Sequence, residues 1–225
     1  MCHKNAAVCA TKFRRIIEMA NPVTVFYHAD CLDGFGAAYA AWRYFGDTAR
    51  YRALHHGDAW SPDEVKGHDV YILDFSFPPD ALGEMAKHAA SVVQIDHHAS
   101  ALAPWRERMV ADAQGRQTYR HDTLNLIFDL NKSGARLAWE YFHPSEAVPL
   151  PLLHIEDQDL WRFTLPGTRA FCRALRLQSF TFAAWDELIR DATNDSSPGY
   201  RETLRQGEAI EGFFAREVER LAASP

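Results

Sequence analysis

The stretch VTVFYHADCLDGFGAAYAAW, residues 23–42, joins the pattern of a buried strand to that of a helix. Residues 23–27 are β-branched or aromatic, which is typical of a short strand buried on both faces. Residues 34–45 repeat apolar side chains at helical spacing, and Asp33 directly before them is expected to cap this helix. The turn between the two elements holds metal-ligating side chains: His28, Asp30, Cys31 and Asp33.

The same alternation continues along the chain. Strands are expected at residues 49–54, 69–77 and 91–100, and a helix at residues 78–90. Strands that alternate with helices of this length predict an α/β fold, namely a doubly wound, mainly parallel sheet with helices on both faces. In such sheets the ligand site lies beyond the carboxyl ends of the strands.

The second half of the chain is more helical. Residues 101–122 have a weak, polar pattern and are expected to form a long excursion, whereas residues 133–142 are expected to be a helix. Beyond Thr168 the pattern predicts further helices, at 182–192 and 200–222. The expected organisation has three parts: an N-terminal arm at 1–21, a catalytic domain at 22–165 and a small C-terminal helical extension at 166–225.

Composition limits the possible environment and partners. The chain has 225 residues, of which 47% are hydrophobic, enough for a genuine core. No apolar run reaches the roughly 18–20 residues of a membrane helix, so no membrane partner is expected. The four cysteines form no C-x-x-C pair, and the N-terminal residues lack the hydrophobic centre of a secretory signal, so a cytoplasmic location is expected. The net charge of −6 disfavours binding to long duplex nucleic acid.

Acidic and histidine residues recur where strands are expected to end. Eight such residues are candidate ligands: His28, Asp30, Asp33, Asp74, Asp96, His97, Asp157 and Asp159. Carboxylates with a minority of imidazoles suit Mn²⁺ or Mg²⁺ better than a structural zinc site. So many anions in one cleft would repel one another unless cations lay between them. Two divalent metal ions that activate a water for attack on phosphorus are the usual solution.

Four blocks of sequence then resemble a known family. They are, in order, HADCLDG at 28–34, YILDFSF at 71–77, the tripeptide DHH at 96–98, and HIEDQDLW at 154–161. The chain is similar in these blocks to the DHH phosphoesterase superfamily, which includes RecJ-like exonucleases, nano-RNases, cyclic-dinucleotide phosphodiesterases and family II pyrophosphatases. The resemblance covers roughly residues 23–165, and four ordered blocks are far more specific than one tripeptide.

The resemblance implies a role for each metal ligand. His28 and an acid of the first block would hold one metal, and Asp74 would bridge to a second. Asp33, His97 and an aspartate of the fourth block would complete the second site. The nucleophile would be a bridging water or hydroxide, and two metal ions are expected, with Mn²⁺ favoured over Mg²⁺.

Four further residues receive supporting roles by the same resemblance. His98 is similar to the family's phosphate-contacting histidine, and Asp96 would orient its histidine neighbours. Ser133 and Gly134 at a helix start would offer backbone amides to a phosphate.

The sequence departs from the family pattern in two places. The first block often has the form D-x-D, but here Cys31 occupies the first acidic position and Asp30 precedes it. Asp30 is the favoured ligand because carboxylate suits a hard ion better than thiolate does. The fourth block offers both Asp157 and Asp159 and does not choose between them. Residues 166–225 contain no Gly-Gly motif, so the family's glycine-rich substrate module is not expected within them.

The predicted function is a metal-dependent phosphoesterase that hydrolyses a small phosphodiester, a short oligonucleotide or a nucleotide. The alternatives are a phosphomonoesterase or pyrophosphatase, and a nucleotide-binding module impaired in catalysis. The oligomeric state stays open, a homo-oligomer included. The tryptophans at 42, 139, 161 and 185 are expected to be core anchors rather than base-stacking platforms. Trp161 is the candidate exception, because it directly follows the fourth block.

Overall fold

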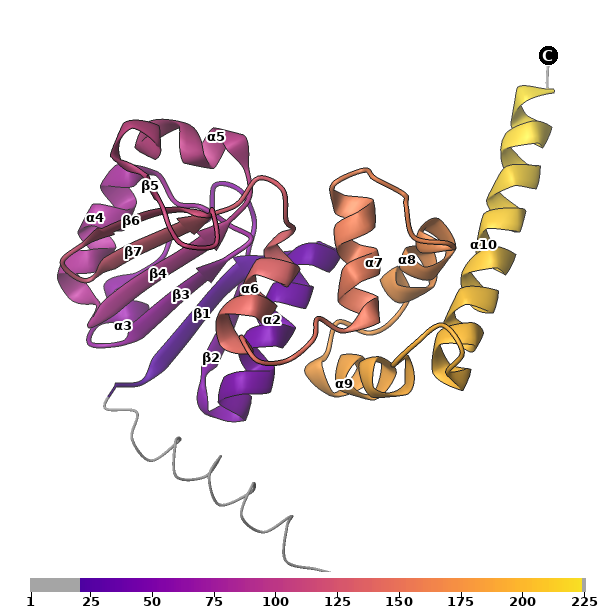
Figure 1. The fold of residues 1–225 in the computed structure, drawn as a ribbon, viewed down its shortest axis with the longest axis horizontal. Coiled ribbons are helices and arrows are strands. Elements are labelled where there is room, and N and C mark those ends of the chain that lie inside the picture. Colours follow the sequence, from indigo (N-terminus) through magenta and orange to yellow (C-terminus); the bar gives the residue numbers. More distant parts are fainter. Residues whose placement is uncertain (1–20, 224–225) are drawn as a thin grey trace, which may run out of the picture.

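A seven-stranded sheet forms the centre of the protein in the computed structural model, which describes residues 21–223 (Figure 1). Its strands lie in the order β2-β1-β3-β4-β7-β6-β5. The first five are parallel: Arg50–Leu54, Val23–His28, Asp69–Leu73, Ser91–Asp96 and Leu124–Phe128. The last two, β6 (Gln117–His121) and β5 (Val110–Ala111), are antiparallel. The predicted α/β fold with a mainly parallel sheet is confirmed, whereas the expected arm at 1–21 lies outside the described residues apart from Asn21.

Helices cover both faces of the sheet because alternate strand residues feed two separate cores. Val25 of β1 packs with α2 (Leu32–Phe45) and α6 (Gly134–Phe142) on one face. Phe26, the next residue, belongs to the core on the other face. That second face is covered by short helices and a 3-10 turn: α3 (Pro62–Val65), α4 (Pro79–His88), α5 (Ala99–Leu102) and η2 (Ala103–Arg108).

The C-terminal part is a helical layer beside the sheet (Figure 1). It consists of α7 (Leu150–Asp159), α8 (Thr168–Arg176), α9 (Phe182–Asp191) and α10 (Pro198–Ala222). Trp185 of α9 is fully buried, with its ring centroid 4.8 Å from that of Phe35 in α2. This packing joins the extension to the core of the sheet layer.

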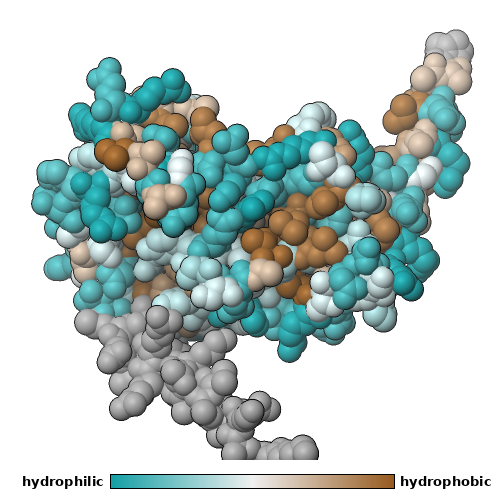
Figure 2. Space-filling model, in the orientation of Figure 1, coloured by the Kyte–Doolittle hydropathy of each residue, from teal (hydrophilic) through white to brown (hydrophobic). Residues whose placement is uncertain are grey.

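Helix α10 is only partly covered. Its first half packs on α8, while its end projects away from the body (Figure 1). Figure 2 shows brown apolar surface beside teal surface along that end. Four large apolar side chains are exposed there: Phe213, Phe214, Val218 and Leu221.

Two local expectations differ from the structure. The helix expected at 34–45 begins at Leu32 with Cys31 at the N-cap position, so Asp33 does not cap it. Residues 101–122, expected to form a long excursion, contain β5 and β6, and β7 follows them without having been predicted. The side chains of β5 and β6 are partly or fully exposed at the sheet edge, so these strands lack the apolar alternation that marks a buried strand. The 3-10 turn η1 (Gly46–Thr48) ends α2.

No helix within the described range 21–223 combines the length and the apolar character needed to cross a bilayer.

The contact between α8 and α10 depends on a glycine, which gives a first prediction. A Cβ added to Gly207 would lie 1.7 Å from the carbonyl oxygen of Ala170, whereas one added to Gly212 would come no closer than 3.7 Å to a side-chain atom of Arg216. Gly207→Ala is expected to destabilise the protein by at least about 1–3 kcal/mol because the two backbones must separate. Gly212→Ala, the matched control, is expected to stabilise the same helix by about 0.5–1 kcal/mol.

Urea unfolding followed by circular dichroism checks this pair. Equal unfolding midpoints for Gly207→Ala and the wild type would contradict the close packing of α8 on α10.

Candidate metal centre

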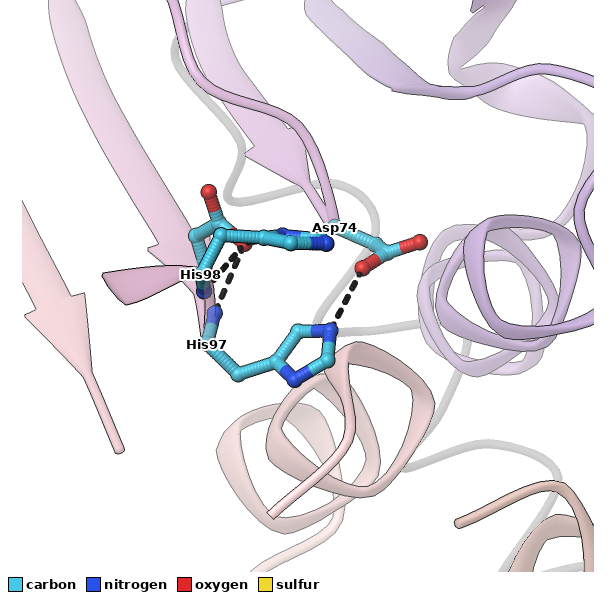
Figure 3. Close-up of side chains that lie close together, drawn as sticks. Asp74, His97 and His98 are labelled. Carbon is cyan, nitrogen blue, oxygen red and sulfur yellow. Dashed lines mark hydrogen bonds and ion pairs between the residues drawn. The ribbon is translucent and has the colours of Figure 1, made fainter. Parts of the chain in front are cut away.

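The carboxyl ends of three neighbouring parallel strands bring the central side chains together. β1 lies between β2 and β3, so the chain crosses from one side of β1 to the other, and such switch points leave a crevice at the strand ends. His28 ends β1, Asp74 follows β3 and His97 follows β4. Nδ1 of His28 lies 3.6 Å from Oδ2 of Asp74, and Nε2 of His97 lies 3.2 Å from Oδ1 of the same carboxylate. Figure 3 shows His97 pointing at Asp74 across this space.

Two helices add a carboxylate each. Asp33 comes from the first turn of α2 and Asp159 from the last residue of α7. Each places an oxygen 3.5 Å from Nε2 of His97. The imidazole nitrogen of His97 is therefore surrounded by oxygens of three carboxylates.

The donor atoms form three sets. His28, Cys31 and Asp74 offer the first, and Asp33, His97 and Asp159 offer the second, while Asp74, Asp96, His97 and His98 offer a third that overlaps them; the atoms of each set lie within 4.8 Å of one another. Asp74 is near the histidines of the first two sets. The arrangement could hold two cations with Asp74 between them.

The pKa values of the central residues reflect the excess negative charge of the centre. Burial, then repulsion from Asp74 and Asp159, raises the pKa of Asp33 well above that of an ordinary carboxyl. Burial opposes protonation of His97, but its close contact with the Asp74 carboxylate and attraction by Asp33, Asp74 and Asp159 outweigh burial and raise the pKa of His97 to about 9. Without a cation, the centre therefore retains protons to offset its negative charge.

Two buried atoms at the centre lack a well-oriented hydrogen bond. They are Oδ1 of Asp74 and Nε2 of His97, which face each other. Asp74 is 2% exposed, and its backbone φ of 51° is unusual for a residue other than glycine. Buried polar atoms without partners are uncommon, and oxygen and imidazole donors suit a divalent metal. These residues therefore fit a metal ion.

The first block places Cys31, rather than Asp30, at the centre. The thiol of Cys31 belongs to the set with His28 and Asp74. Asp30 has a φ of 52°, its side chain is 91% exposed, and its carboxylate lies 3.8 Å from Nε2 of His55. The structure thus corrects the preference for Asp30, because the turn directs that side chain outward to solvent.

The two aspartates of the fourth block have different surroundings in the structure. Asp157 and Asp159 lie in the last turn of a helix, not at the end of a strand. The carboxylate of Asp157 accepts hydrogen bonds from the backbone amides and hydroxyls of the following loop: Thr164 N and Oγ1, Leu165 N and Thr168 Oγ1. Asp157 is thus engaged in holding the loop, and Asp159 is the acid that reaches His97.

Asp96 and His98 stand beside the centre. Asp96 is fully buried, and its carboxylate accepts from the Ser76 hydroxyl, the His97 amide and Nδ1 of His98. This carboxylate holds the strand end from which both histidines project. The His98 side chain is 48% exposed, so its outer edge remains accessible.

Ser133 and Gly134 do not present free amides. The Gly134 amide donates to Asp33 at 2.6 Å and the Ser133 amide to Glu156 at 3.3 Å. A Cβ on Gly134 would lie 2.5 Å from that of Asp74, so the glycine permits the start of α6 to approach the centre. This arrangement speaks against the predicted phosphate contact, because carboxylates already occupy the helix N-terminus.

His56, which is not among the candidate ligands named from the sequence, also lies close to the site. Its ring centroid is 5.0 Å from that of His28, and the ring stacks on Phe75 at 5.6 Å. Only the fold brings the loop after β2 against the end of β1.

The different roles of the two fourth-block aspartates give a second prediction. In metal-free protein, Asp157→Ala is expected to lower the free energy of unfolding by at least about 2 kcal/mol, because four buried or partly buried hydrogen bonds lose their acceptor. Asp159→Asn is expected to leave it unchanged or to raise it, because one of three repelling carboxylates disappears. Urea unfolding in EDTA measures both, and equal losses in the two variants would contradict the assignment.

Comparison with known proteins provides a distant relative. No family model matches the chain. The chain is 28% identical over 187 residues, 77% of its length, to the uncharacterized protein R106 of Acanthamoeba polyphaga mimivirus. The aligned part spans 41% of that viral protein, so the chain corresponds to about two fifths of its relative. The name of this relative states no activity.

Proposed function

We propose that the protein is a metal-dependent phosphoesterase that hydrolyses a small phosphodiester, short oligonucleotide or nucleotide. The observation that carries the proposal is the group of three carboxylates around Nε2 of His97, with Oδ1 of Asp74 and that nitrogen lacking well-oriented hydrogen bonds. The resemblance of four sequence blocks to DHH phosphoesterases supports the same reaction.

The metal-holding residues would be His28, Cys31, Asp74, Asp33, His97 and Asp159. Bound divalent ions supply a water of lowered pKa as nucleophile and neutralise charge on the phosphate. Hydrogen bonds from the surrounding backbone hold the donor side chains in place. Asp33 receives the amides of Gly134 and Ala135 at 2.6 and 2.9 Å, which fixes its carboxylate at the start of α6.

His98 is the proposed contact to the phosphate. Its Nδ1–H donates to the buried Asp96 carboxylate at 2.7 Å, and this hydrogen bond raises the pKa of His98 despite partial burial. The protonated ring then offers its Nε2–H at the accessible edge. A proton held there can stabilise a phosphoryl oxygen or pass to the leaving oxygen.

A third prediction tests the reaction. Asp74→Asn is expected to lower kcat/KM for bis(p-nitrophenyl) phosphate with Mn²⁺ by more than the roughly 10- to 100-fold that follows loss of an outer partner of a metal site. Asparagine tolerates the positive φ of Asp74, so the fold is retained. Asp30→Asn is the control and is expected to keep wild-type turnover, because Asp30 points to solvent.

The assay is extended to pyrophosphate, a mononucleotide and a dinucleotide. Full activity of Asp74→Asn would contradict the proposal. Turnover of pyrophosphate or the mononucleotide alone would identify the substrate as a terminal or inorganic phosphate instead of a phosphodiester.

A fourth prediction concerns the thiol. A donor set of thiol, imidazole and carboxylate favours a transition metal over Mg²⁺. Titration of metal-free protein with Co²⁺ is expected to produce a near-ultraviolet thiolate-to-cobalt absorption band. Cys31→Ser should lose this band, whereas Cys172→Ser should keep it, because Cys172 is buried between helices away from the ligand sets. An unchanged band in Cys31→Ser would remove the thiol from the centre.

A further inference from the structure

An exposed aromatic residue follows the metal centre directly along the chain. Trp161 lies two residues after Asp159, so their Cα atoms are at most about 7 Å apart. Its side chain, expected from the sequence to be a core anchor, is 74% exposed. A single exposed aromatic residue is ordinary, whereas exposed apolar groups that gather at one place mark contact sites. Trp139 and Trp185, by contrast, are buried as expected.

Trp161 lines one surface hollow with Phe163 and a row of arginines from α8. We call this surface the Trp161 hollow; it is lined by Trp161, Phe163, Arg169, Arg173 and Arg176, together with Gln158, Cys172 and Glu211. Its volume is about 290 Å³. The arginines recur at positions i, i+4 and i+7 of α8, so the helix presents them on one side.

The aromatic rings and the first arginine are arranged against one another. The rings of Trp161 and Phe163 meet edge to face with centroids 5.0 Å apart. The Arg169 guanidinium lies 3.8 Å from the Phe163 centroid and 5.7 Å from that of Trp161. Stacked guanidinium and aromatic planes are the surfaces on which single-stranded nucleic-acid bases stack.

The hollow carries excess positive charge although the whole chain is acidic. Arg173 is paired with Glu211 at 2.5 Å. Neither Arg169 nor Arg176 has a carboxylate within salt-bridge distance among residues 21–223. An anion next to a flat aromatic group matches this combination, and inorganic phosphate or pyrophosphate alone would not use the exposed indole.

The loop that carries the two aromatics is held by Asp157. The backbone carbonyl of Asp157 accepts from the amides of Arg162 and Phe163, and its carboxylate accepts from Thr164 and Leu165. The same short segment thus directs Asp159 to the metal centre and Trp161 to the hollow.

We infer that the Trp161 hollow binds a nucleobase and an adjoining phosphate of a short single-stranded oligonucleotide. This inference rests on the proposed function, because it assigns the substrate of the metal centre to nucleic acid strands. A base stacks on Trp161, and Arg169 and Arg176 contact the phosphate while a neighbouring phosphodiester lies at Asp74 and His97.

Fluorescence anisotropy with the full chain tests the base contact. The probes are a fluorescein-labelled pentathymidylate and a labelled strand of the same length and charge with abasic sites, measured in EDTA and again in Ca²⁺. The wild-type protein is expected to bind the thymidylate about 10-fold more tightly, a ratio typical of one base stack. Trp161→Ala is expected to abolish this preference and Trp161→Phe to retain most of it.

A second pair of variants separates charge from stacking. Arg176→Ala is expected to weaken the binding of both probes equally. It is also expected to lower by about one the number of phosphate contacts inferred from the salt dependence of the affinity. Tyr44→Ala is the control, because it removes a partly exposed aromatic side chain at the opposite end of α2 from Asp33. It should change neither the preference for the thymidylate over the abasic strand nor the salt dependence of binding.

Equal wild-type affinity for the two strands would overturn the inference, as would a base preference that survives in Trp161→Ala. Displacement of the thymidylate by a phosphopeptide at equal concentration would overturn it in favour of a protein ligand. Since binding is measured without turnover, failure of hydrolysis in the earlier assays and failure of base recognition are separate results.

Discussion

Three parallel strands that end at the same edge of a sheet impose the central constraint on this protein. β1, β3 and β4 deliver His28, Asp74 and His97 to one place, and α2 and α7 add Asp33 and Asp159 there. Burial removes the water that would screen these carboxylates, so their mutual repulsion must be offset by protons or by cations. The raised pKa values of Asp33 and His97 express this requirement. A centre of this kind suits divalent metals, and the proposed phosphate chemistry would depend on them.

Backbone segments also pack closely around the metal centre, at two glycines. A Cβ on Gly34 would lie 2.2 Å from the carbonyl oxygen of His28, and one on Gly134 would meet the Asp74 side chain. Both glycines allow a helix start to approach a strand end. Asp33 then joins the two helices, because it lies in the first turn of α2 and accepts the N-terminal amides of α6. Its carboxylate therefore connects the packing of α2 and α6 to the charge balance of the centre.

The C-terminal helices give the protein a surface that the sheet alone would not have. The turn after α7 places Trp161 and Phe163 against arginines of α8, and the extension is anchored by buried Trp185. The resemblance left substrate recognition unassigned, because residues 166–225 contain no Gly-Gly motif like that of the family's substrate module. In the proposed arrangement, the helical extension supplies that recognition through an aromatic and positively charged hollow next to Asp159.

The sequence by itself determined the alternation of strands and helices in the first half of the chain, because this follows from local apolar patterns. It also named His28, Asp74 and His97 as candidates, from their place at expected strand ends and from the four ordered blocks. It did not reveal β5 and β6, whose exposed side chains carry little pattern, nor β7, although the side chains of β7 are mostly buried. Only the tertiary structure decided between Asp30 and Cys31, since one positive φ turns Asp30 to solvent. It likewise separated Asp157 from Asp159, because the partners of Asp157 lie seven to eleven residues further along the chain. Side-chain direction depends on such contacts and not on spacing alone.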